Sequence, residues 1–254
     1  MNRLPGFLES YKDTLPEAER IRAQAIFSTV LSFAKASYQG IMVIDLIKKT
    51  VPFQIASPML FDKELSGMRP LKIDYDYYRK YMPLEELPLL AEIIYAGRDF
   101  RSHIPAEEYT QWSYSFDFHI KFNRVPILHN HKIIPLTLNP EGQLWLVLAI
   151  TSISCEDKAG NLRMAKDGES FYYEYSIENK VWKKKDKIIL TTSEKYIIFL
   201  SAAGKSINEV AKALNISADA IKKARQRLFL KLNVNNMSEA ITLASLNNFI
   251  ITVR

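Results

Sequence analysis

The chain has 254 residues, of which 48% are hydrophobic and 24% charged, and its net charge is +6. These values are typical of a soluble globular protein with one large or two smaller domains, and they argue against disorder. The longest apolar run, 144–150, is far shorter than the ~20 residues that cross a bilayer, and residues 1–10 lack an apolar signal-peptide core. The single cysteine, Cys155, cannot form an internal disulfide. We therefore expect a cytoplasmic protein without a membrane partner.

Residues 16–36 are predicted to form a helix, and 1–37 is taken as an N-terminal helical segment. Its apolar positions recur at helical spacing and form one stripe. The stripe consists of Ile21, Ala25, Ile26, Thr29, Val30 and Phe33. It fits packing on the next domain and packing on a second subunit equally well.

Residues 38–182 alternate between strand-like and helical patterns. Two strands are expected first, then two short helices, then further strands. The ranges are 40–45 and 51–57 for the first strands, 75–81 and 84–96 for the helices, and 113–123, 132–138, 144–154, 170–177 and 180–182 for the later strands. This order predicts an α+β domain built on an antiparallel sheet.

Few side chains in this region have the spacing of a catalytic site or a metal site. His129 and His131 would share a face if they lay on a strand, but two ligands do not make a metal site, and His103 and His119 lack a supporting spacing. We interpret them as ordinary loop histidines and expect no metal. Asp45 stands alone, without the paired acidic residues of a phosphoacceptor domain. No nucleophile–base pair or phosphate loop is visible, so we expect neither an enzyme nor a cofactor.

Two aromatic clusters allow two interpretations. They could line a binding pocket, but core or dimer packing is favoured. The clusters are Tyr75, Tyr77, Tyr78 and Tyr81, and residues 171–175.

Positive charge is concentrated at the C-terminal end. Residues 181–254 carry 13 basic and 5 acidic side chains, a net charge of +8, which leaves −2 for residues 1–180. Such asymmetry suggests a module that binds a polyanion. The basic run from Lys183 to Lys187 lies in an expected linker, 183–189, and fits either a solvated connection or direct contact with DNA.

Residues 190–254 are predicted to form four short helices, because helix-starting and helix-ending residues follow one another closely. Thr191 and Glu194 form one capping box, and Ser206 and Glu209 form another. Gly204 and Asn233 suit left-handed helix ends. Ser217 is expected to begin a third helix over 218–232, and Ser238 a fourth. Two helices joined by a tight turn make a helix-turn-helix unit.

The third helix has two chemically different faces at about 100° per residue. One face carries Ile221, Ala224, Leu228 and Leu232 toward the core. The opposite face carries Asp219, Lys222, Lys223, Gln226 and Arg227. Arg225 lies beside the core stripe. The polar face fits contacts to phosphates and base edges, although an ordinary solvated helix would look similar.

About fifteen positions of this segment, in order and without a gap, resemble the LuxR/GerE-type DNA-binding domain over 190–248. They run from Leu190, Glu194 and Gly204 through Val210, Ile216, Ile221, Lys222 and Leu232 to Glu239 and Ala240. The resemblance implies a four-helix domain whose third helix enters the major groove of double-stranded DNA, and a homodimer on paired half-sites. Lys222 matches the family's recognition-helix lysine and Lys231 its phosphate-contacting lysine. The expected DNA contacts are Ser217, Lys222, Lys223, Gln226, Arg227 and Lys231.

The sequence also departs from the LuxR pattern. Ala220 replaces a threonine that offers a phosphate hydroxyl, and Ala224 replaces a histidine. Thr192 and Ser193 occupy the positions of the usual Pro-Arg, and the usual arginine near Asn236 is replaced. These changes keep a second hypothesis open, namely an adaptor protein whose helix-turn-helix no longer binds DNA.

Residues 38–155 resemble a PAS-like sensor domain. The resemblance rests on residues 40–45, 82–87 and 139–153. PAS-like pockets lie between a sheet face and small helices, and the resemblance implies dimerisation or a small-molecule ligand. Cys155 is not flanked by the Asn-Cys-Arg motif of a covalent flavin photocycle. An acyl-homoserine-lactone domain lacks a motif here. The leading hypothesis is therefore a sequence-specific transcription regulator whose DNA binding is gated by its N-terminal domain.

Overall fold

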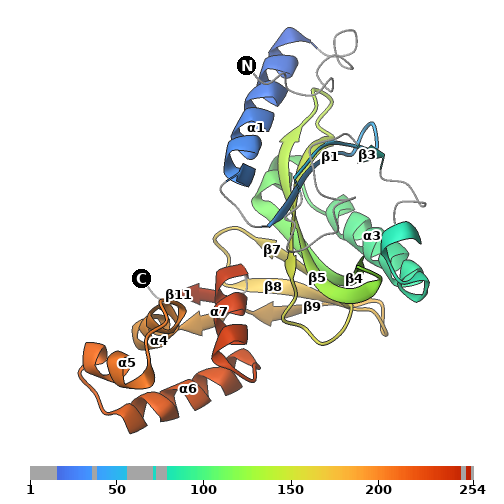
Figure 1. The fold of residues 1–254 in the computed structure, drawn as a ribbon. Coiled ribbons are helices and arrows are strands. Elements are labelled where there is room, and N and C mark those ends of the chain that lie inside the picture. Colours follow the sequence, from blue (N-terminus) through green and yellow to red (C-terminus); the bar gives the residue numbers. More distant parts are fainter. Residues whose placement is uncertain (1–15, 36–38, 56–70, 73–78, 247–249, 253–254) are drawn as a thin grey trace. The chain divides into compact units, whose positions relative to one another are not determined.

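The computed structural model describes residues 16–35, 39–55, 71–72, 79–246 and 250–252 (Figure 1). The predicted cluster residues Tyr75, Tyr77 and Tyr78 lie outside this part of the chain. The chain divides into two compact units, the first comprising 1–167 and 174–183 and the second 168–173 and 184–254. No helix among the described residues has the length and apolar character needed to cross a membrane.

The first unit is built on a long antiparallel sheet. Its helical elements are α1 (Glu17–Lys35), η2 (Leu84–Glu86), α3 (Leu87–Ser102) and η3 (Ala106–Gln111). The strands of the sheet are β1 (Gly40–Asp45), β2 (Thr50–Ile55), β3 (Leu71–Lys72), β4 (Trp112–Phe122), β5 (Val125–Leu138), β6 (Leu144–Ile153), β7 (Gly160–Lys166), β8 (Phe171–Ser176) and β9 (Val181–Asp186). Residues 171–173 of β8 and 184–186 of β9 are assigned to the second unit. The strands lie in the order β3-β2-β1-β6-β5-β4-β7-β8-β9.

The centre of the sheet joins segments that are distant in sequence. β1 pairs antiparallel with both β2 and β6, so that Ile41 lies opposite Ile55 on one side and Ile150 on the other. β6 continues through β5 to β4, and β4 pairs with β7. The second unit, described below, is mainly helical. The predicted α+β class, an antiparallel sheet domain followed by a helical C-terminal domain, is confirmed.

Helix α1 covers one face of the sheet. Ala23, Phe27, Val30 and Ala34 are buried and pack in one cluster with Ile41, Val43, Trp145 and Leu146 of β1 and β6. The predicted stripe is wrong in part, because Ile21 and Phe33 are 61% and 52% exposed. The helix turns its two small alanines toward the sheet instead, and a small side chain allows a closer approach of the two backbones. The spacing of apolar residues in the sequence predicted that the bulkier Ile21 and Phe33 would face the sheet.

The opposite face of the sheet packs against α3. Leu90, Ile93 and Ala96 of this helix share a core with Phe116 and Phe118 of β4 and with further buried residues of β5 and β6. The Tyr175 hydroxyl on β8 donates to Glu92 at 2.7 Å, which anchors the outer side of α3. Tyr81 and Tyr175, both from the predicted aromatic clusters, belong to or pack against this core.

Two strand predictions need correction. β5 begins at Val125 rather than at residue 132, so His129 and His131 are strand residues and not loop residues; their side chains are 0% and 5% exposed. β7 has no counterpart in the prediction. Both strands are stabilised by pairing with β4, and a polar His-Asn-His segment gives no local sign of that pairing.

Asp45 has a structural position at the end of β1. Its carboxylate is fully buried and accepts hydrogen bonds from the backbone N–H of Ile47 and Lys48, at 2.9 and 2.7 Å. The Trp145 Nε1–H donates to its second oxygen at 3.1 Å. One carboxylate therefore closes the turn after β1 and ties that turn to β6.

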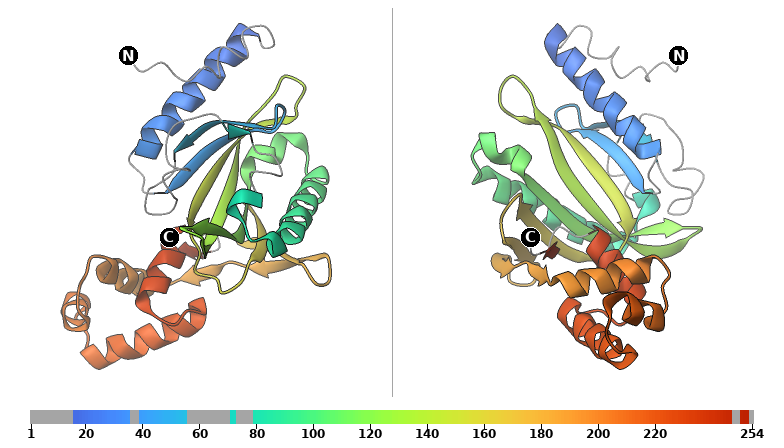
Figure 2. Two further views of the ribbon diagram at one scale, coloured as in Figure 1. Left: turned by 45° about the vertical axis from the view of Figure 1, so that its right-hand side comes forward. Right: turned by 90° about the vertical axis from the view of Figure 1, so that its left-hand side faces the viewer.

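From residue 188 onward, the described part of the second unit contains four helices and a short two-stranded sheet, which Figure 2 shows from two further directions. Its elements are β10 (Ile188–Leu190), α4 (Thr192–Ala202), α5 (Ile207–Leu214), α6 (Ala218–Leu232), α7 (Met237–Leu246) and β11 (Ile250–Thr252). β10 pairs parallel with β11. The segment 183–189, predicted as a linker, carries the end of β9 and the start of β10.

Candidate functional sites

The helices of the second unit begin and end at residues that satisfy their free backbone groups. The Thr191 and Ser206 hydroxyls accept from the N–H of Glu194 and Glu209, and both glutamates reach back to the cap N–H, at 2.7 and 2.8 Å. Both predicted capping boxes are confirmed. The prediction for α7 is wrong, because Asn236 rather than Ser238 accepts from the Glu239 N–H, at 2.9 Å. The asparagine at 236 is an equally good cap and precedes Met237, which is buried.

A tight turn sets α6 against α5. α5 ends at Asn215 in the left-handed conformation, with φ 54°, and Ser217 begins α6 by accepting from the Ala220 N–H at 3.1 Å. Asparagine tolerates this backbone better than most residues with a side chain. The unit α5–turn–α6 is therefore a helix-turn-helix, and Ser217 serves as the N-cap of its second helix.

Helix α6 separates a buried face from an exposed face. Ile221, Leu228 and Leu232 are 0 to 3% exposed and belong to the core of the unit. The expected contact residues Lys222, Lys223, Gln226 and Arg227 are all exposed along the same helix. Most of this polar face carries positive charge and offers hydrogen-bond donors, which is the chemistry that phosphates and purine edges require.

Two basic residues of α6, Lys222 and Arg225, have contacts within their own helix. Lys222 Nζ lies 3.0 Å from Asp219 Oδ1, but both side chains are largely exposed, so this pair contributes little stability and can exchange for another anion. The Arg225 guanidinium lies 5.9 Å from the centre of the Phe229 ring. Arg225 therefore lies against its own helix, beside the core stripe as predicted.

Lys231 joins two helices. Its Nζ lies 2.7 Å from Glu194 Oε2, which connects the end of α6 to the start of α4. Partial burial alone would raise the pKa of Glu194, but hydrogen bonds from Lys231 and from Thr191 outweigh it and hold the pKa below its ordinary value. Lys231 therefore has a structural role whether or not it also contacts a phosphate.

Replacing Glu194 by alanine is expected to destabilise the second unit by about 1–2 kcal/mol at pH 7, because it removes the carboxylate that accepts from the Thr191 N–H and forms the ion pair with Lys231. A carboxyl whose pKa is lowered in the folded state contributes stability above its unfolded pKa and loses it as the pH falls through the folded value. The difference between wild type and variant should therefore shrink below about pH 4. Urea unfolding of the full-length protein, followed by circular dichroism at several pH values, measures it.

Glu194→Gln is the matched control for this prediction, because glutamine can still accept from the Thr191 N–H but cannot form the ion pair with Lys231. It should lose less stability than the alanine variant. Equal midpoints for wild type and Glu194→Ala at pH 7 would contradict the structural role assigned to this residue.

One residue on the exposed face of α6 was not expected from the sequence. Leu230 is 83% exposed, although leucine is usually buried. At 100° per residue, Leu230 lies about 40° from Gln226 and about 60° from Arg227 around the helix axis. It lies about 160° from Leu228, on the opposite face. The same helical projection that separated the two faces would have found it, had exposed apolar side chains been considered alongside the polar ones.

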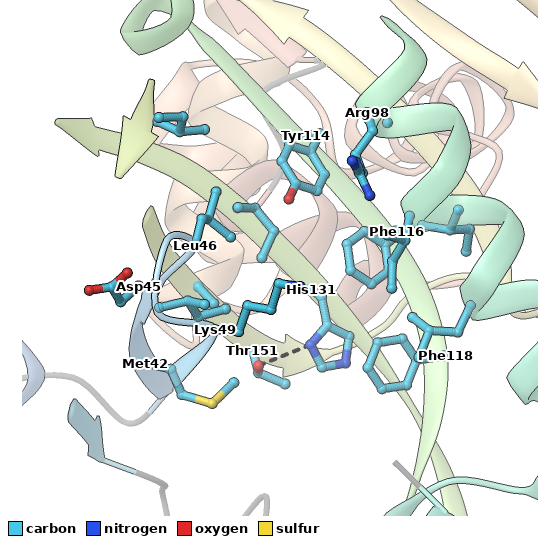
Figure 3. Close-up of a pocket in the computed structure, with 18 of the residues that line it drawn as sticks. Met42, Asp45, Leu46, Lys49, Arg98, Tyr114, Phe116, Phe118, His131 and Thr151 are labelled. Atoms are coloured by element: carbon cyan, nitrogen blue, oxygen red, sulfur yellow. Dashed lines mark hydrogen bonds between the residues drawn. The ribbon is translucent and has the colours of Figure 1, made fainter. Parts of the chain in front are cut away.

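The first unit contains a cavity of about 810 Å³ between the sheet and α3. It is lined by side chains of β1, α3, β4, β5 and β6, among them Met42, Arg98, Phe118, His131 and Thr151 (Figure 3). A cavity of this size is in the range of small-molecule sites in proteins. Within the described residues, no three His, Cys, Asp or Glu side chains come together as a metal site, and His129 instead contacts the Ile127 carbonyl oxygen at 2.7 Å.

The helix-turn-helix, its capped helices and its basic exposed face define the second unit as a DNA-binding domain of the helix-turn-helix class. Residues 188–244 match the family described as bacterial regulatory proteins, luxR family. This segment is therefore a LuxR-family domain, as the sequence resemblance implied, and its family is one of regulators rather than enzymes. The match includes α4, α5 and α6 and most of α7.

Several solved structures are similar along most of the chain. The phage VqmA–DPO complex has 13% identity and a TM-score of 0.34, and covers 89% of this chain and 91% of that one. A Vibrio cholerae VqmA–ligand–DNA complex has 13% identity and a TM-score of 0.30, over 88% and 89%. A VqmA dimer from the same organism without target DNA has 14% identity and a TM-score of 0.26, and covers 87% of this chain and 89% of that one. No curated protein matches the chain. Similarity at this level adds nothing to the assignment, which rests on the family match.

Proposed function

We propose that this protein is a sequence-specific transcription regulator whose second unit binds double-stranded DNA through α6. The observation that carries the proposal is the exposed basic face of this helix, on the second helix of a LuxR-family helix-turn-helix. In this role α6 enters the major groove, and Lys222, Lys223, Gln226 and Arg227 contact phosphates and base edges. Leu230 adds an apolar contact that suits a thymine methyl group.

The remaining expected contacts have more restricted roles. Ser217 lies at the N-terminus of α6, where a hydroxyl and free N–H groups suit a phosphate. Lys231 reaches a phosphate only by sharing or releasing Glu194, because the two side chains form an ion pair. The protein acts as a homodimer in this proposal, since helix-turn-helix proteins commonly read two half-sites with two copies.

We also propose that the first unit is a PAS-like sensor domain that gates DNA binding. Its cavity lies between the sheet and α3, which is where the PAS-like resemblance places a ligand pocket. In the sheet β1 lies between β2 and β6, and residues of β1 and β2 line the cavity together with residues of β4, β5 and β6, so a ligand in this cavity touches both groups of strands. A ligand that binds one conformation better than another shifts the population toward it, and that shift is the proposed signal.

The DNA-binding part is tested with full-length protein and labelled fragments of its own promoter region, by fluorescence anisotropy between 50 and 200 mM salt. One fragment should bind more tightly than unrelated DNA, and its affinity should fall steeply with salt because bound lysines and arginines displace counterions. Absence of binding to any fragment, or affinity that is independent of salt, would reject this function and favour the adaptor hypothesis.

The gating part is tested with Ala149→Phe, which places a ring in the cavity from β6; Ala149 is 1% exposed and lines the cavity. The purified variant should bind promoter DNA, but transcription from that promoter should no longer respond to growth conditions that change it in wild-type cells. An unchanged response, with the variant folded as judged by circular dichroism, would reject gating through the cavity.

A further inference from the structure

One end of the cavity is a stack of flat side chains. The ring centroids of Phe118 and His131 are 3.8 Å apart and their planes differ by 4°. Phe116 continues the stack, with centroids 5.6 Å from His131 and 5.7 Å from Phe118. This end favours an apolar and partly planar group, because such a group loses little hydration and gains close contact with the rings.

His131 adds a single polar position within this apolar end. Its side chain is 5% exposed, its Nδ1 lies 3.2 Å from Thr151 Oγ1, and its Nε2 is buried without a hydrogen-bond partner in the described part of the chain. Burial, and then the neighbouring His129, lower the pKa of His131 well below its ordinary value, so the ring is neutral at pH 7. A buried polar atom without a partner is costly, and a ligand hydroxyl would satisfy either tautomer of the ring.

Three basic side chains also line the cavity. Lys49, from the turn after β1, and Arg98 and Arg101, three residues apart on α3, all line it. Figure 3 shows Lys49 and Arg98 among the side chains around the cavity. None of the three forms an ion pair with any residue in the ranges that the structure describes.

Among the described residues that line the cavity, Asp45 is the one carboxylate, and its oxygens already accept from Ile47, Lys48 and Trp145. In Figure 3 its carboxylate points away from the labelled cavity side chains. The described lining of the cavity therefore has positive charge and hydrogen-bond donors in excess, which suits a carboxylate or a similar anion.

We propose that the cavity binds an amphipathic organic acid, with its apolar body against Phe116 and Phe118, a hydroxyl at His131, and its anionic group at Lys49, Arg98 and Arg101. This inference rests on the proposed sensing function of the first unit and names the chemical class of its ligand. The three features come from separate elements of the fold, and together they define a direction for the ligand, with its charge toward α3 and the turn after β1.

Two fluorescent probes with the same ring system test the charge requirement. The anionic probe is 8-anilinonaphthalene-1-sulfonate, and the neutral probe is N-phenyl-1-naphthylamine, which lacks the sulfonate. Both are titrated into the full-length protein and into Arg98→Gln/Arg101→Gln. The double variant should bind the anionic probe about 10- to 100-fold more weakly, while its affinity for the neutral probe should change less than about twofold; each tenfold loss corresponds to about 1.4 kcal/mol.

Three variants assign the effect to the cavity. Lys158→Gln removes one exposed charge outside the cavity lining and should bind both probes as wild type does. Ala149→Phe should weaken both probes, because it occupies the apolar space itself. His131→Phe keeps the stack but removes the polar atom, so it should leave both probes, which lack a hydroxyl, bound within about threefold of wild type while weakening a hydroxyl-bearing naphthoic acid relative to the parent acid.

The outcomes separate this inference from the function on which it rests. Equal losses of both probes in the arginine variant would overturn the anionic class. Binding of the neutral probe alone, abolished by Ala149→Phe, would overturn the class as well but leave a ligand-gated sensor standing. Binding of neither probe to folded wild-type protein would overturn both.

Discussion

Full-length protein carrying Lys222→Ala and Arg227→Ala is expected to bind promoter DNA about 10- to 100-fold more weakly than wild type at 100 mM salt. The two side chains are exposed on the same face of α6, and no core contact depends on their charges. Losing one good base contact or phosphate contact costs about 1–3 kcal/mol, and the two losses should add in part. Fluorescence anisotropy with the promoter fragment measures the change.

The salt dependence shows which kind of contact is lost. If both side chains neutralise phosphates, the slope of log K against log salt should fall by about two, since each phosphate contact contributes about 0.9. If one of them reads a base, the slope should fall by only about one and the preference for the promoter over unrelated DNA should also fall. The slope and the preference together therefore assign the two roles.

A matched double variant removes two exposed lysines outside α6, Lys158→Ala and Lys195→Ala. It lowers the net charge by the same amount and should change the affinity less than about threefold. An equal loss in both double variants would mean that overall charge, not the face of α6, determines binding. Unchanged affinity in Lys222→Ala/Arg227→Ala would reject α6 as the reading helix.

Leu228→Ala is expected to destabilise the second unit by about 3 kcal/mol, within the 2–5 kcal/mol range for removing a buried leucine side chain. Leu228 is 0% exposed and lies at the centre of the core that joins α4, α5, α6 and α7. The loss is a large share of the stability of a unit of this size, so the DNA-binding domain should unfold at markedly lower urea concentration. Circular dichroism during urea unfolding gives the change.

Leu230→Ala provides the control within the same helix. The chemical change is identical, but Leu230 is 83% exposed, so the stability should change by less than about 0.5 kcal/mol. Under the proposed function, this variant should instead weaken promoter binding by several-fold. Similar unfolding midpoints for the two variants would contradict the assignment of the buried and exposed faces of α6.

The second unit was predictable in detail because its signals are local. Thr191 and Glu194 are three residues apart, as are Ser206 and Glu209, and each pair forms the capping box expected from its spacing. Asn215 and Asn233 end their helices in the left-handed conformation. The one misplaced cap, Ser238 for Asn236, arose because two good cap residues stand two positions apart.

The sheet of the first unit was less predictable because its partners are remote. Residues 125–131 form a strand because they pair with β4. Helix α1 packs Ala23 and Ala34 against a surface that β1 and β6 supply. The cavity combines residues from near 49, 98 and 131, and no spacing in the sequence brings these together. The helix predicted over 84–96 ends before Arg98 and Arg101, which lie in the last turns of α3.

The pairing of β1 with β6 also has a consequence for how the chain matures during synthesis. Asp45 and Trp145 are 100 residues apart, and β6 supplies Trp145 and Leu146 to the buried cluster under α1. Until residue 153 has left the ribosome, α1 and β1 have only part of the surface that buries them. Because contacts between remote segments form slowly, the sheet unit should fold late and expose apolar surface meanwhile, whereas the helices of the second unit, whose contacts are local, should fold quickly once made. Nascent chains that end before residue 144 are therefore expected to need chaperone protection more than nascent chains that end after residue 166.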